Sequence, residues 1–384
     1  MKWLFDRRYN RMKQLIILLL VSFHISCSKK ITTPEPPIVT PPNNSTIGYT
    51  SATAVIDSMG TGFNLGNTFD YSLHNTNPIN IYPIIDLYIN AGMKHIRIPV
   101  TWMDGFNGNT LADANGNINF SHTRFIQLKA VIDYALSKKL FVVLNTHHES
   151  WLYKNFNGLL PLTNSFANLW KGIATHFKDY PHQLIFEVLN EPQGVFGDWN
   201  GGTNPLNNSA ILLTRQINNI GYQAIRQTGG LNTNRVIMVS TNAMGNHQQL
   251  DDVYPSLETL PGGGADKYLS FHVHTYDPWA FCGQTGSNTF WPGSNVIANS
   301  LKAVSTYAKS LNVPVNYGEF GVGRESNAAE RNSVIVREYY RTMRLTCLNE
   351  RMSPTVWDDR GWFGLVNSVG NSFIHNIVPN MMAP

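Results

Sequence analysis

Cysteine is rare in this sequence. Three cysteines occur in 384 residues, and only Cys282 and Cys347 lie beyond the N-terminal region. Two cysteines are too few for the disulfide framework of a small secreted scaffold, and neither has the spacing of a structural zinc site. We therefore expect an ordinary hydrophobic core to hold the fold, and the sequence leaves open whether the two thiols pair.

A strongly basic surface is also lacking. The formal net charge of +4 comes from residues 1–30, which hold seven Lys or Arg and a single acid, Asp6. Residues 31–384 carry 22 basic and 24 acidic side chains. This balance offers no electrostatic footprint for nucleic acid, and we expect no nucleic-acid partner.

The N-terminal apolar run is too short for a permanent membrane span. Leu15–Phe23 follows a basic stretch, and this order is typical of an export signal. His24-Ile-Ser-Cys27 then resembles the lipobox of bacterial lipoproteins, although that motif usually has Leu in place of His24. We predict a signal peptide over residues 1–27, a lipid anchor at Cys27, and a location in the bacterial cell envelope or outside the cell. Translation from Met12 would produce a complete signal as well.

Proline is concentrated just after this signal. Residues 28–48 contain five prolines among Thr, Asn and Ser, a composition that favours an extended linker over a folded element. No second linker follows, so we expect one domain over residues 49–384. A chain of this length is sufficient for a single large α/β barrel.

Apolar strand-like runs alternate with helix-like stretches throughout that domain. The eight runs begin at Gly62, His95, Phe141, Leu184, Val236, Tyr268, Val313 and Ser353. Helical periodicity separates them, for example from a cap at Ser121 through Leu136, and again over residues 328–350. Eight such repeats predict an α/β fold, a (β/α)8 TIM barrel. A doubly wound open sheet is the alternative, but the sequence contains no G-x-G-x-x-G or Walker motif to support it.

One stretch, Phe186-Glu-Val-Leu-Asn-Glu-Pro192, requires more than packing to explain it. It reads as a buried strand that ends in an amide and a carboxylate, Asn190 and Glu191. Burying such groups without partners is costly. Glu187 and Glu191 share strand parity and should point to the same side, so this strand needs a polar interior or a functional site.

The other predicted strands also end in polar or aromatic side chains. Together these residues are Asn67, Arg97, His147, His148, Asn190, Glu191, His274, Tyr276, Glu319, Trp357 and Asp358. In a TIM barrel the carboxyl ends of the strands form the active-site face. Parity places the polar set, including Tyr317 with Glu319, toward the barrel axis, and Val143, Phe271 and Val273 toward the helices.

Glu191 and Glu319 are the two carboxylates that could meet across this face. A carboxylate pair is the machinery of glycosidic bond cleavage, in which one group protonates the leaving oxygen and the other attacks or activates water. The two roles require different pKa values. We expect Arg97, His274 and Tyr276 to keep Glu319 ionised, and Glu191, beside the neutral Asn190, to stay protonated.

Seven blocks of the sequence resemble the signature blocks of family 5 glycoside hydrolases. They are Gly62-Phe-Asn-Leu-Gly-Asn-Thr68, Ile96-Arg-Ile-Pro99, Asn145-Thr-His-His148, Leu189-Asn-Glu-Pro192, His274-Thr-Tyr276, Gly318-Glu-Phe-Gly321 and Val356-Trp-Asp358. They occur in the family's order and cover about residues 60 to 360. Their form is most similar to the bacterial endo-β-1,4-glucanase branch, the cellulases.

The resemblance implies a retaining endo-glycosidase that acts on cellulose-type or mixed-linkage β-glucans. It implies that Glu191 is the acid/base and Glu319 the nucleophile, with Arg97 and Tyr276 holding the nucleophile and Asn190 binding the sugar 2-hydroxyl. His147, His274 and Trp357 correspond to residues that line the subsite at the cleaved bond. Asn67 and His148 are further candidates for support. We expect no cofactor, no metal and a monomer.

Three alternatives remain open. Loop sequences decide the polymer, so a xyloglucanase or β-mannanase with the same mechanism is the main alternative. A second is a polysaccharide-binding protein without catalysis. A third is a metal-dependent hydrolase that uses His147-His148-Glu149 or His272-Val-His274 as ligands. Five tryptophans near the predicted strand ends could stack on sugars or pack in loops, namely Trp102, Trp151, Trp199, Trp279 and Trp291, whereas Trp170 lies on a helical apolar stripe and should be core.

Overall fold

The computed structural model describes residues 48, 50–105 and 110–384. The predicted signal peptide over 1–27 and nearly all of the predicted linker over 28–48 lie outside these residues. The description below therefore concerns the predicted domain over 49–384.

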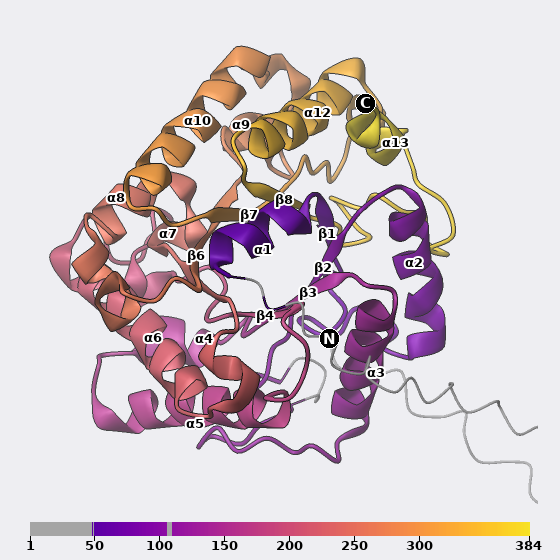
Figure 1. Cartoon of the computed structure of the whole chain (residues 1–384). Coiled ribbons are helices and arrows are strands. Elements are labelled where there is room, and N and C mark those ends of the chain that lie inside the picture. The colour runs from indigo at the N-terminus through magenta and orange to yellow at the C-terminus, as the bar shows by residue number, and fades with distance from the viewer. Residues whose placement is uncertain (1–47, 49, 106–109) are drawn as a thin grey trace, which may run out of the picture. The chain divides into compact units, whose positions relative to one another are not determined.

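Eight parallel strands close into a barrel in sequence order, with β8 pairing back onto β1 (Figure 1). The strands are β1 Gly62–Asn64, β2 His95–Ile98, β3 Phe141–Asn145, β4 Leu184–Glu187, β5 Ile237–Ser240, β6 Leu269–Thr275, β7 Val315–Phe320 and β8 Ser353–Val356. The predicted TIM barrel is confirmed, and the open-sheet alternative is wrong because β1 has a neighbour on both sides.

Helices surround the barrel and cover the outer side of the strands (Figure 1). The longer helices are α2 Pro78–Asn90, α3 Thr123–Ser137, α5 Leu160–His176, α6 Asn208–Arg226, α10 Ser294–Ser310 and α12 Val334–Asn349. Shorter ones are α1 Ala52–Met59, α4 Ser150–Asn155, α7 Asn242–Gly245, α8 Leu250–Val253, α9 Trp279–Cys282, α11 Ala328–Arg331 and α13 Ile377–Met382. A large cluster of buried apolar residues fills the layer between strands and helices.

Two predicted helix boundaries are wrong. The helix expected to start from Ser121 is capped instead by His122, whose Nδ1 accepts from the backbone N–H of Arg124 at 3.1 Å. The continuous helix expected over residues 328–350 is two helices, because Ser333 has an extended backbone and its hydroxyl accepts from Val336 to start a new helix.

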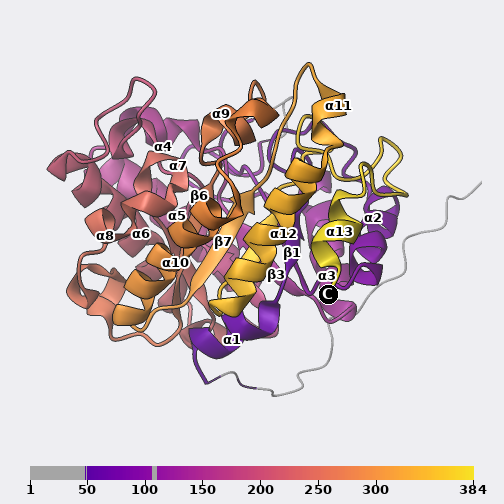
Figure 2. The same ribbon diagram turned by 90° about the horizontal axis from the view of Figure 1, so that it is seen from above.

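α1 closes the amino-terminal end of the barrel. In Figure 2 it lies at the opposite end of the molecule from the short helices α9 and α11. Its buried residues join the inward side chains of β3, β4 and β5, including Phe141 and Val143, in a small separate cluster. Val143 therefore points inward, contrary to our prediction, because it shares the parity of Asn145 and His147.

A bulge interrupts β7. Val273 pairs with Tyr317, but the next residue of β6, His274, pairs with Glu319, so Gly318 is an extra residue on β7. The extra residue reverses the parity of the strand at this point. Tyr317 consequently lies in the outer cluster, and the prediction that it shares a face with Glu319 is wrong.

Both cysteines of the domain are buried and free, which answers the question that the sequence left open. Trp170 is fully buried as predicted, and its Nε1 donates to the carbonyl of Val188 at 2.9 Å. Across the described residues, no helix is both long and apolar enough to cross a membrane.

Candidate active site

Arg97 is the centre of the polar network at the carboxyl end of the barrel. β2 directs this side chain inward, and it is fully buried. Its guanidinium donates five hydrogen bonds of 2.6 to 2.8 Å. The acceptors are two oxygens of Glu187 and one oxygen each of Asn64, Asn190 and Glu319. One side chain therefore ties together β1, β2, β4 and β7 in a fixed geometry.

The pairing with Glu187 balances the charge of Arg97. Burial by itself raises the pKa of Glu187, but the adjacent guanidinium outweighs this and holds that pKa at about 2. Conversely, burial would lower the pKa of Arg97, whereas Glu187 and then Glu319 raise it. Both groups are therefore charged at neutral pH, and Glu187 supports the site through Arg97 instead of facing the opening.

Glu191 and Glu319 meet across the barrel mouth. One oxygen of each, together with a ring nitrogen of His274, lie within 4.8 Å of one another. Retaining glycosidases separate their two carboxyl groups by roughly 5–5.5 Å, whereas inverting enzymes need roughly 6.5–9.5 Å to admit a water. The separation in this structure fits direct attack by one carboxylate on the sugar.

Glu319 is held by donors on two sides. Arg97 Nη1 donates to Oε1 at 2.8 Å, and the Tyr276 hydroxyl donates to Oε2 at 3.0 Å. Burial raises the pKa of Glu319 above its usual value, although the charge of Arg97 acts in the opposite direction. Two positioned donors favour the ionised form, and they orient the carboxylate toward the opening.

Glu191 has a different environment. Its side chain is 17% exposed, and its Oε1 lies 3.1 Å from Nδ1 of His274. Burial raises the pKa of Glu191 to about 7, and Arg97 only partly opposes this. The backbone of Glu191 has φ of +41°, a strained conformation for a residue with a side chain that is often found at functional sites.

Hydrogen bonds fix the orientation of the Asn190 and His147 side chains. The Oδ1 of Asn190 accepts from Arg97, and its buried Nδ2 has no hydrogen-bond partner of normal geometry among the described residues. Asn145 donates to Nδ1 of His147 at 3.1 Å and to Glu187 at 3.0 Å, while its Oδ1 accepts from Val100. This orientation places the proton of neutral His147 on Nε2.

Trp357 lies beside this group. Its indole is parallel to the ring of His147, with an interplanar angle of 3° and 6.1 Å between centroids. Gly66 leaves room for it, since a Cβ there would approach the indole to 2.9 Å. The structure thus brings Trp357 together with Arg97, His147, Asn190 and both carboxylates.

Asn67 and His148 lie farther from the carboxylates. The backbone carbonyl of Asn67 accepts from Leu73 and His74, so Asn67 organises the loop after β1. The ring of His148 contacts that of Tyr71 at a tilt of 35°, with ring centroids 3.9 Å apart, and its Nε2 lies 4.0 Å from Asp70.

Within residues 48, 50–105 and 110–384, two groups of side chains have ligand atoms close enough together to hold a metal ion. One is Glu191, His274 and Glu319, the carboxylate pair itself, and the other is Asp70, His147 and His148. In the second group the atom of His147 that faces Asp70 is Nε2, 3.9 Å away, which carries the proton and is therefore suited to donate and not to ligate. Glu149, the other predicted ligand, instead accepts from the backbone of Trp102 and Met103.

Sequence reasoning missed several members of the network. Asn64 donates to the carbonyls of Gly318 and Val356 and accepts from Arg97, which links β1 to β7 and β8. Asp70 is buried, and burial raises its pKa to about 6. The inward parity of Asn64 on β1 was the one available signal, whereas nothing local to the sequence indicates which amides meet Arg97.

The five tryptophans predicted near the strand ends differ in exposure. Trp102 is fully buried, and its Nε1 donates to the carbonyl of Asn145, the last residue of β3. It therefore stabilises the end of this strand. Trp199 and Trp279 are about half exposed, at 54% and 51%, and are available to stack on a sugar. Trp151 and Trp291 are partly buried against the core. Trp362, at 45% exposure, was not predicted.

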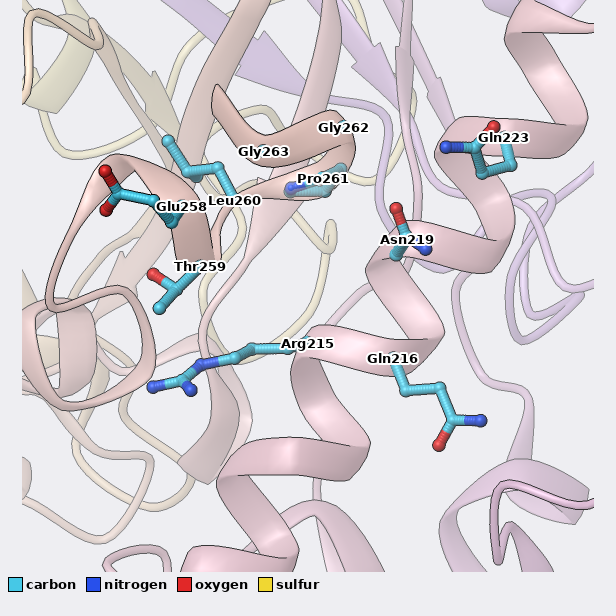
Figure 3. Close-up of a pocket in the computed structure, with 10 residues that line it drawn as sticks. All are labelled: Arg215, Gln216, Asn219, Gln223, Glu258, Thr259, Leu260, Pro261, Gly262 and Gly263. Atoms are coloured by element: carbon cyan, nitrogen blue, oxygen red, sulfur yellow. The ribbon is translucent and has the colours of Figure 1, made fainter. Parts of the chain in front are cut away.

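A shallow hollow of about 430 Å³ is formed by residues that do not belong to this network. It lies between α6 and the segment Leu257–Gly264, and Figure 3 shows Gln216, Asn219 and Gln223 along its α6 side. Its one carboxylate, Glu258, has no second carboxylate to act with. The hollow therefore lacks the pair that glycosidic cleavage requires.

Comparison with known proteins points in the same direction. The family model described as Cellulase (glycosyl hydrolase family 5) matches residues 56–359. Endoglucanase A of Clostridium longisporum is 33% identical over 350 residues, which cover 83% of this chain and 62% of that protein. The chain thus spans less than two thirds of that relative's length.

Solved structures match over almost their whole length. A GH5-4 broad specificity endoglucanase from Clostridium longisporum superimposes with a TM-score of 0.71 at 28% identity, covering 86% of this chain and 97% of that one. The structure of ZgEngAGH5_4 in complex with a cellotriose superimposes with a TM-score of 0.72 at 25% identity, covering 87% and 98%.

Proposed function

This chain belongs to glycosyl hydrolase family 5, and from that premise we propose that it is a retaining endo-β-1,4-glucanase acting on cellulose-type or mixed-linkage β-glucans. The observation that carries the proposal is the pair Glu191 and Glu319, whose oxygens lie within 4.8 Å across the barrel mouth. Its relatives in Clostridium longisporum and Ruminococcus albus are also endoglucanases by name. No feature of the site favours xyloglucan or mannan over these glucans.

In the first step Glu319 is the nucleophile. Its carboxylate, held by Arg97 and Tyr276, attacks the anomeric carbon as the bond to the glycosidic oxygen breaks. Glu191 transfers its proton to that oxygen. A carboxyl group with a pKa of about 7 is suited to this because it is protonated in mildly acidic solution and still a usable acid.

In the second step the roles reverse. Glu191 is now a carboxylate and takes a proton from a water molecule, whose oxygen bonds to the anomeric carbon. The ester bond to Glu319 breaks, and both groups return to their starting states with the anomeric configuration retained. Arg97 keeps its contacts to Glu187 throughout, so its positive charge stays in place while the charge on Glu319 disappears and returns.

The neighbouring side chains would bind and orient the sugar. The Nδ2 of Asn190 has no partner within the usual distance and angle of a hydrogen bond among the described residues. It is therefore available to donate to the 2-hydroxyl of the sugar. The Nε2–H of His147 and the indole of Trp357 border the same space. The related structure with bound cellotriose supports a glucan at this site. The broad specificity of the endoglucanase from Clostridium longisporum supports activity on more than one β-glucan.

A product assay tests this proposal. Purified protein is incubated with cellulose-derived glucan, mixed-linkage glucan, xyloglucan and mannan, beside the variants Glu191→Gln and Glu319→Gln. We expect internal cleavage of the first two polymers and a loss of several orders of magnitude in both variants. If only xyloglucan or mannan is cut, the substrate proposal is wrong. Binding without cleavage would identify a polysaccharide-binding protein.

We also propose that the protein is exported and anchored through a lipid at Cys27. The support is the basic segment, the apolar run and the lipobox-like His24-Ile-Ser-Cys27. Metabolic labelling with a clickable fatty acid in a bacterial host should label the wild type and not Cys27→Ala. Equal labelling of both would contradict the anchor.

A further inference from the structure

A continuous line of hydrogen bonds crosses the barrel interior from α1 to Glu191. It starts at the backbone carbonyl of Met59, the last residue of α1, and passes through five buried side chains. In order these are His95, Thr355, Asn316, His272 and His274. The six links measure 2.7 to 3.1 Å, and the last joins His274 Nδ1 to Glu191 Oε1.

The backbone carbonyl of Met59 determines which atom donates in each of the first hydrogen bonds. A carbonyl oxygen can only accept, so Nδ1 of His95, 2.9 Å away, carries the proton. Burial lowers the pKa of His95 to about 4, and the ring is therefore neutral with a bare Nε2. That nitrogen accepts from the Thr355 hydroxyl at 2.7 Å.

The amide orientation of Asn316 determines which nitrogen of His272 carries the proton. Its Nδ2 donates to the carbonyl of Ser353 at 2.9 Å and to Thr355 Oγ1 at 3.0 Å. Since the Ser353 carbonyl can only accept, the Oδ1 and Nδ2 atoms of Asn316 cannot be exchanged by a flip of its amide. Its Oδ1 therefore faces Nδ1 of His272 at 2.9 Å, and His272 must hold its proton on Nδ1.

The same reasoning fixes the tautomer of His274. Burial lowers the pKa of His272 well below its usual value, so the neutral ring has a bare Nε2. This atom accepts from Nε2 of His274 at 2.9 Å. Burial also lowers the pKa of His274, to about 4, which leaves its Nδ1 without a proton opposite Glu191.

We propose that His272 and Asn316 are positioning residues that hold His274 with its proton on Nε2, so that its bare Nδ1 accepts a hydrogen bond from protonated Glu191. The inference rests on the proposed role of Glu191 as general acid. A bare ring nitrogen favours the protonated carboxyl, whereas a ring N–H in its place would favour the carboxylate. The line of hydrogen bonds thus keeps the catalytic proton on the acid.

Two glycines leave room for this line. A Cβ at Gly318 would lie 1.8 Å from Cε1 of His272, and a Cβ at Gly62 would lie 2.2 Å from Cδ2 of His95. Neither glycine has a positive φ, so close approach, and not backbone conformation, explains both. The rings could not occupy these positions beside any other residue type.

Other charged and titratable groups also lie around Glu191 and His274. Around Glu191 these are Arg97, Glu187, Glu319, His274, Tyr71, Tyr153 and Tyr276. Glu187 Oε1 lies 3.4 Å from Nε2 of His272 and would favour an imidazolium there. Arg97 disfavours this imidazolium in two ways. It donates two hydrogen bonds to the Glu187 carboxylate, and its positive charge lowers the pKa of His272.

Ring-nitrogen NMR on the wild-type protein tests the tautomers without any variant. Histidine labelled with 15N in the ring distinguishes protonated from bare nitrogens, and His272→Gln and His274→Gln assign the signals. We expect a proton on Nδ1 of His272 and on Nε2 of His274 at pH 6. A proton on Nδ1 of His274, or a doubly protonated His272, would overturn the proposal.

The variant Asn316→Asp tests the consequence for the acid. A carboxylate beside His272 favours its doubly protonated form, which then donates to His274 and moves the proton of that ring to Nδ1. We expect the basic limb of the kcat profile to move down by at least about one pH unit. Hydrolysis of an aryl cellobioside whose leaving group needs no protonation should be far less affected. An unmoved basic limb would overturn the proposal.

The matched control is Asn218→Asp, which places a carboxylate at another fully buried asparagine with its own carbonyl partners, Thr214 and Ser240. It should leave the basic limb in place. Failure of the proposed function would be seen differently, as a wild type that cleaves no β-glucan. The NMR result does not depend on activity, so the two failures can be told apart.

Discussion

Arg97 donates two hydrogen bonds to Glu187, at 2.6 and 2.8 Å, and both side chains are fully buried. A buried ion pair of this kind is costly to form but far more costly to break, because one charge is then left without its partner. The pair spans β2 and β4 and carries the donor that reaches Glu319. The same contact therefore contributes to both the stability of the barrel and the geometry of the nucleophile.

Replacing Glu187 with Gln should destabilise the protein by about 3 kcal/mol, because Arg97 remains buried with only Glu319 to balance its charge. Urea unfolding of wild type and variant measures this. The control is Arg351→Ala, which removes the exposed Arg351–Asp57 pair and should leave the unfolding midpoint nearly unchanged. Equal effects of the two substitutions would contradict our account of the buried pair.

The same pair makes stability depend on acid pH. The pKa of Glu187 falls from 4.5 to about 2 on folding, because Arg97 outweighs the effect of burial. A lowered pKa contributes stability that is present above pH 4.5 and is lost as the pH falls toward about 2. The free energy of unfolding should therefore decline over this range in the wild type, and less steeply in Glu187→Gln.

The pH dependence of kcat/KM should show a basic limb near 7. Burial raises the pKa of Glu191 to about 7, and the first step requires its protonated form, so activity falls above that pH. The acidic limb reports Glu319, whose raised pKa places it above that of an ordinary glutamate. Measurement on a soluble β-glucan checks both limbs. A rate that is flat to pH 9 would be incompatible with Glu191 as the acid.

Tyr276→Phe should reduce kcat/KM by about 10- to 100-fold. The substitution removes one donor to the Glu319 carboxylate, and a hydrogen bond to a charged group contributes about 1.5–3 kcal/mol. With one donor fewer, the acidic limb should also move to higher pH. Tyr307→Phe is the matched control, because its hydroxyl donates to the carbonyl of Tyr254 outside the site, and its kinetics should match the wild type.

The sequence indicated the barrel because each strand is a short apolar run. Such a run is a local signal, which can be recognised without knowing its tertiary contacts. It also indicated Glu191 and Glu319, since a carboxylate at the tip of a buried strand is hard to explain by packing. Tyr317 was misplaced because one extra residue, Gly318, reverses parity without any local signal. Asn64 and Asn316 were missed because they lie before the ends of their predicted strands, whereas the site residues were sought at those ends.

Gly318→Ala should impair both folding and activity. The added Cβ would lie 1.8 Å from Cε1 of His272, and such overpacking costs about 3 kcal/mol or displaces the ring. A lower melting temperature and a lower kcat are expected together. Gly48→Ala is the control, because no atom of the described residues lies within 4 Å of its Cβ position. A fully active Gly318→Ala would contradict the tight approach of Gly318 to His272.

The central claim is that Glu319 forms a covalent bond to the sugar while Glu191 acts as the acid. A fluorinated cellobioside with an activated leaving group accumulates this intermediate, because fluorine at C2 slows its hydrolysis. Mass spectrometry of the digested protein then locates the adduct. We predict one glycosyl group on the peptide that contains Glu319, and none in Glu319→Gln. An adduct on Glu191, or inactivation of the variant as fast as the wild type, would contradict the account.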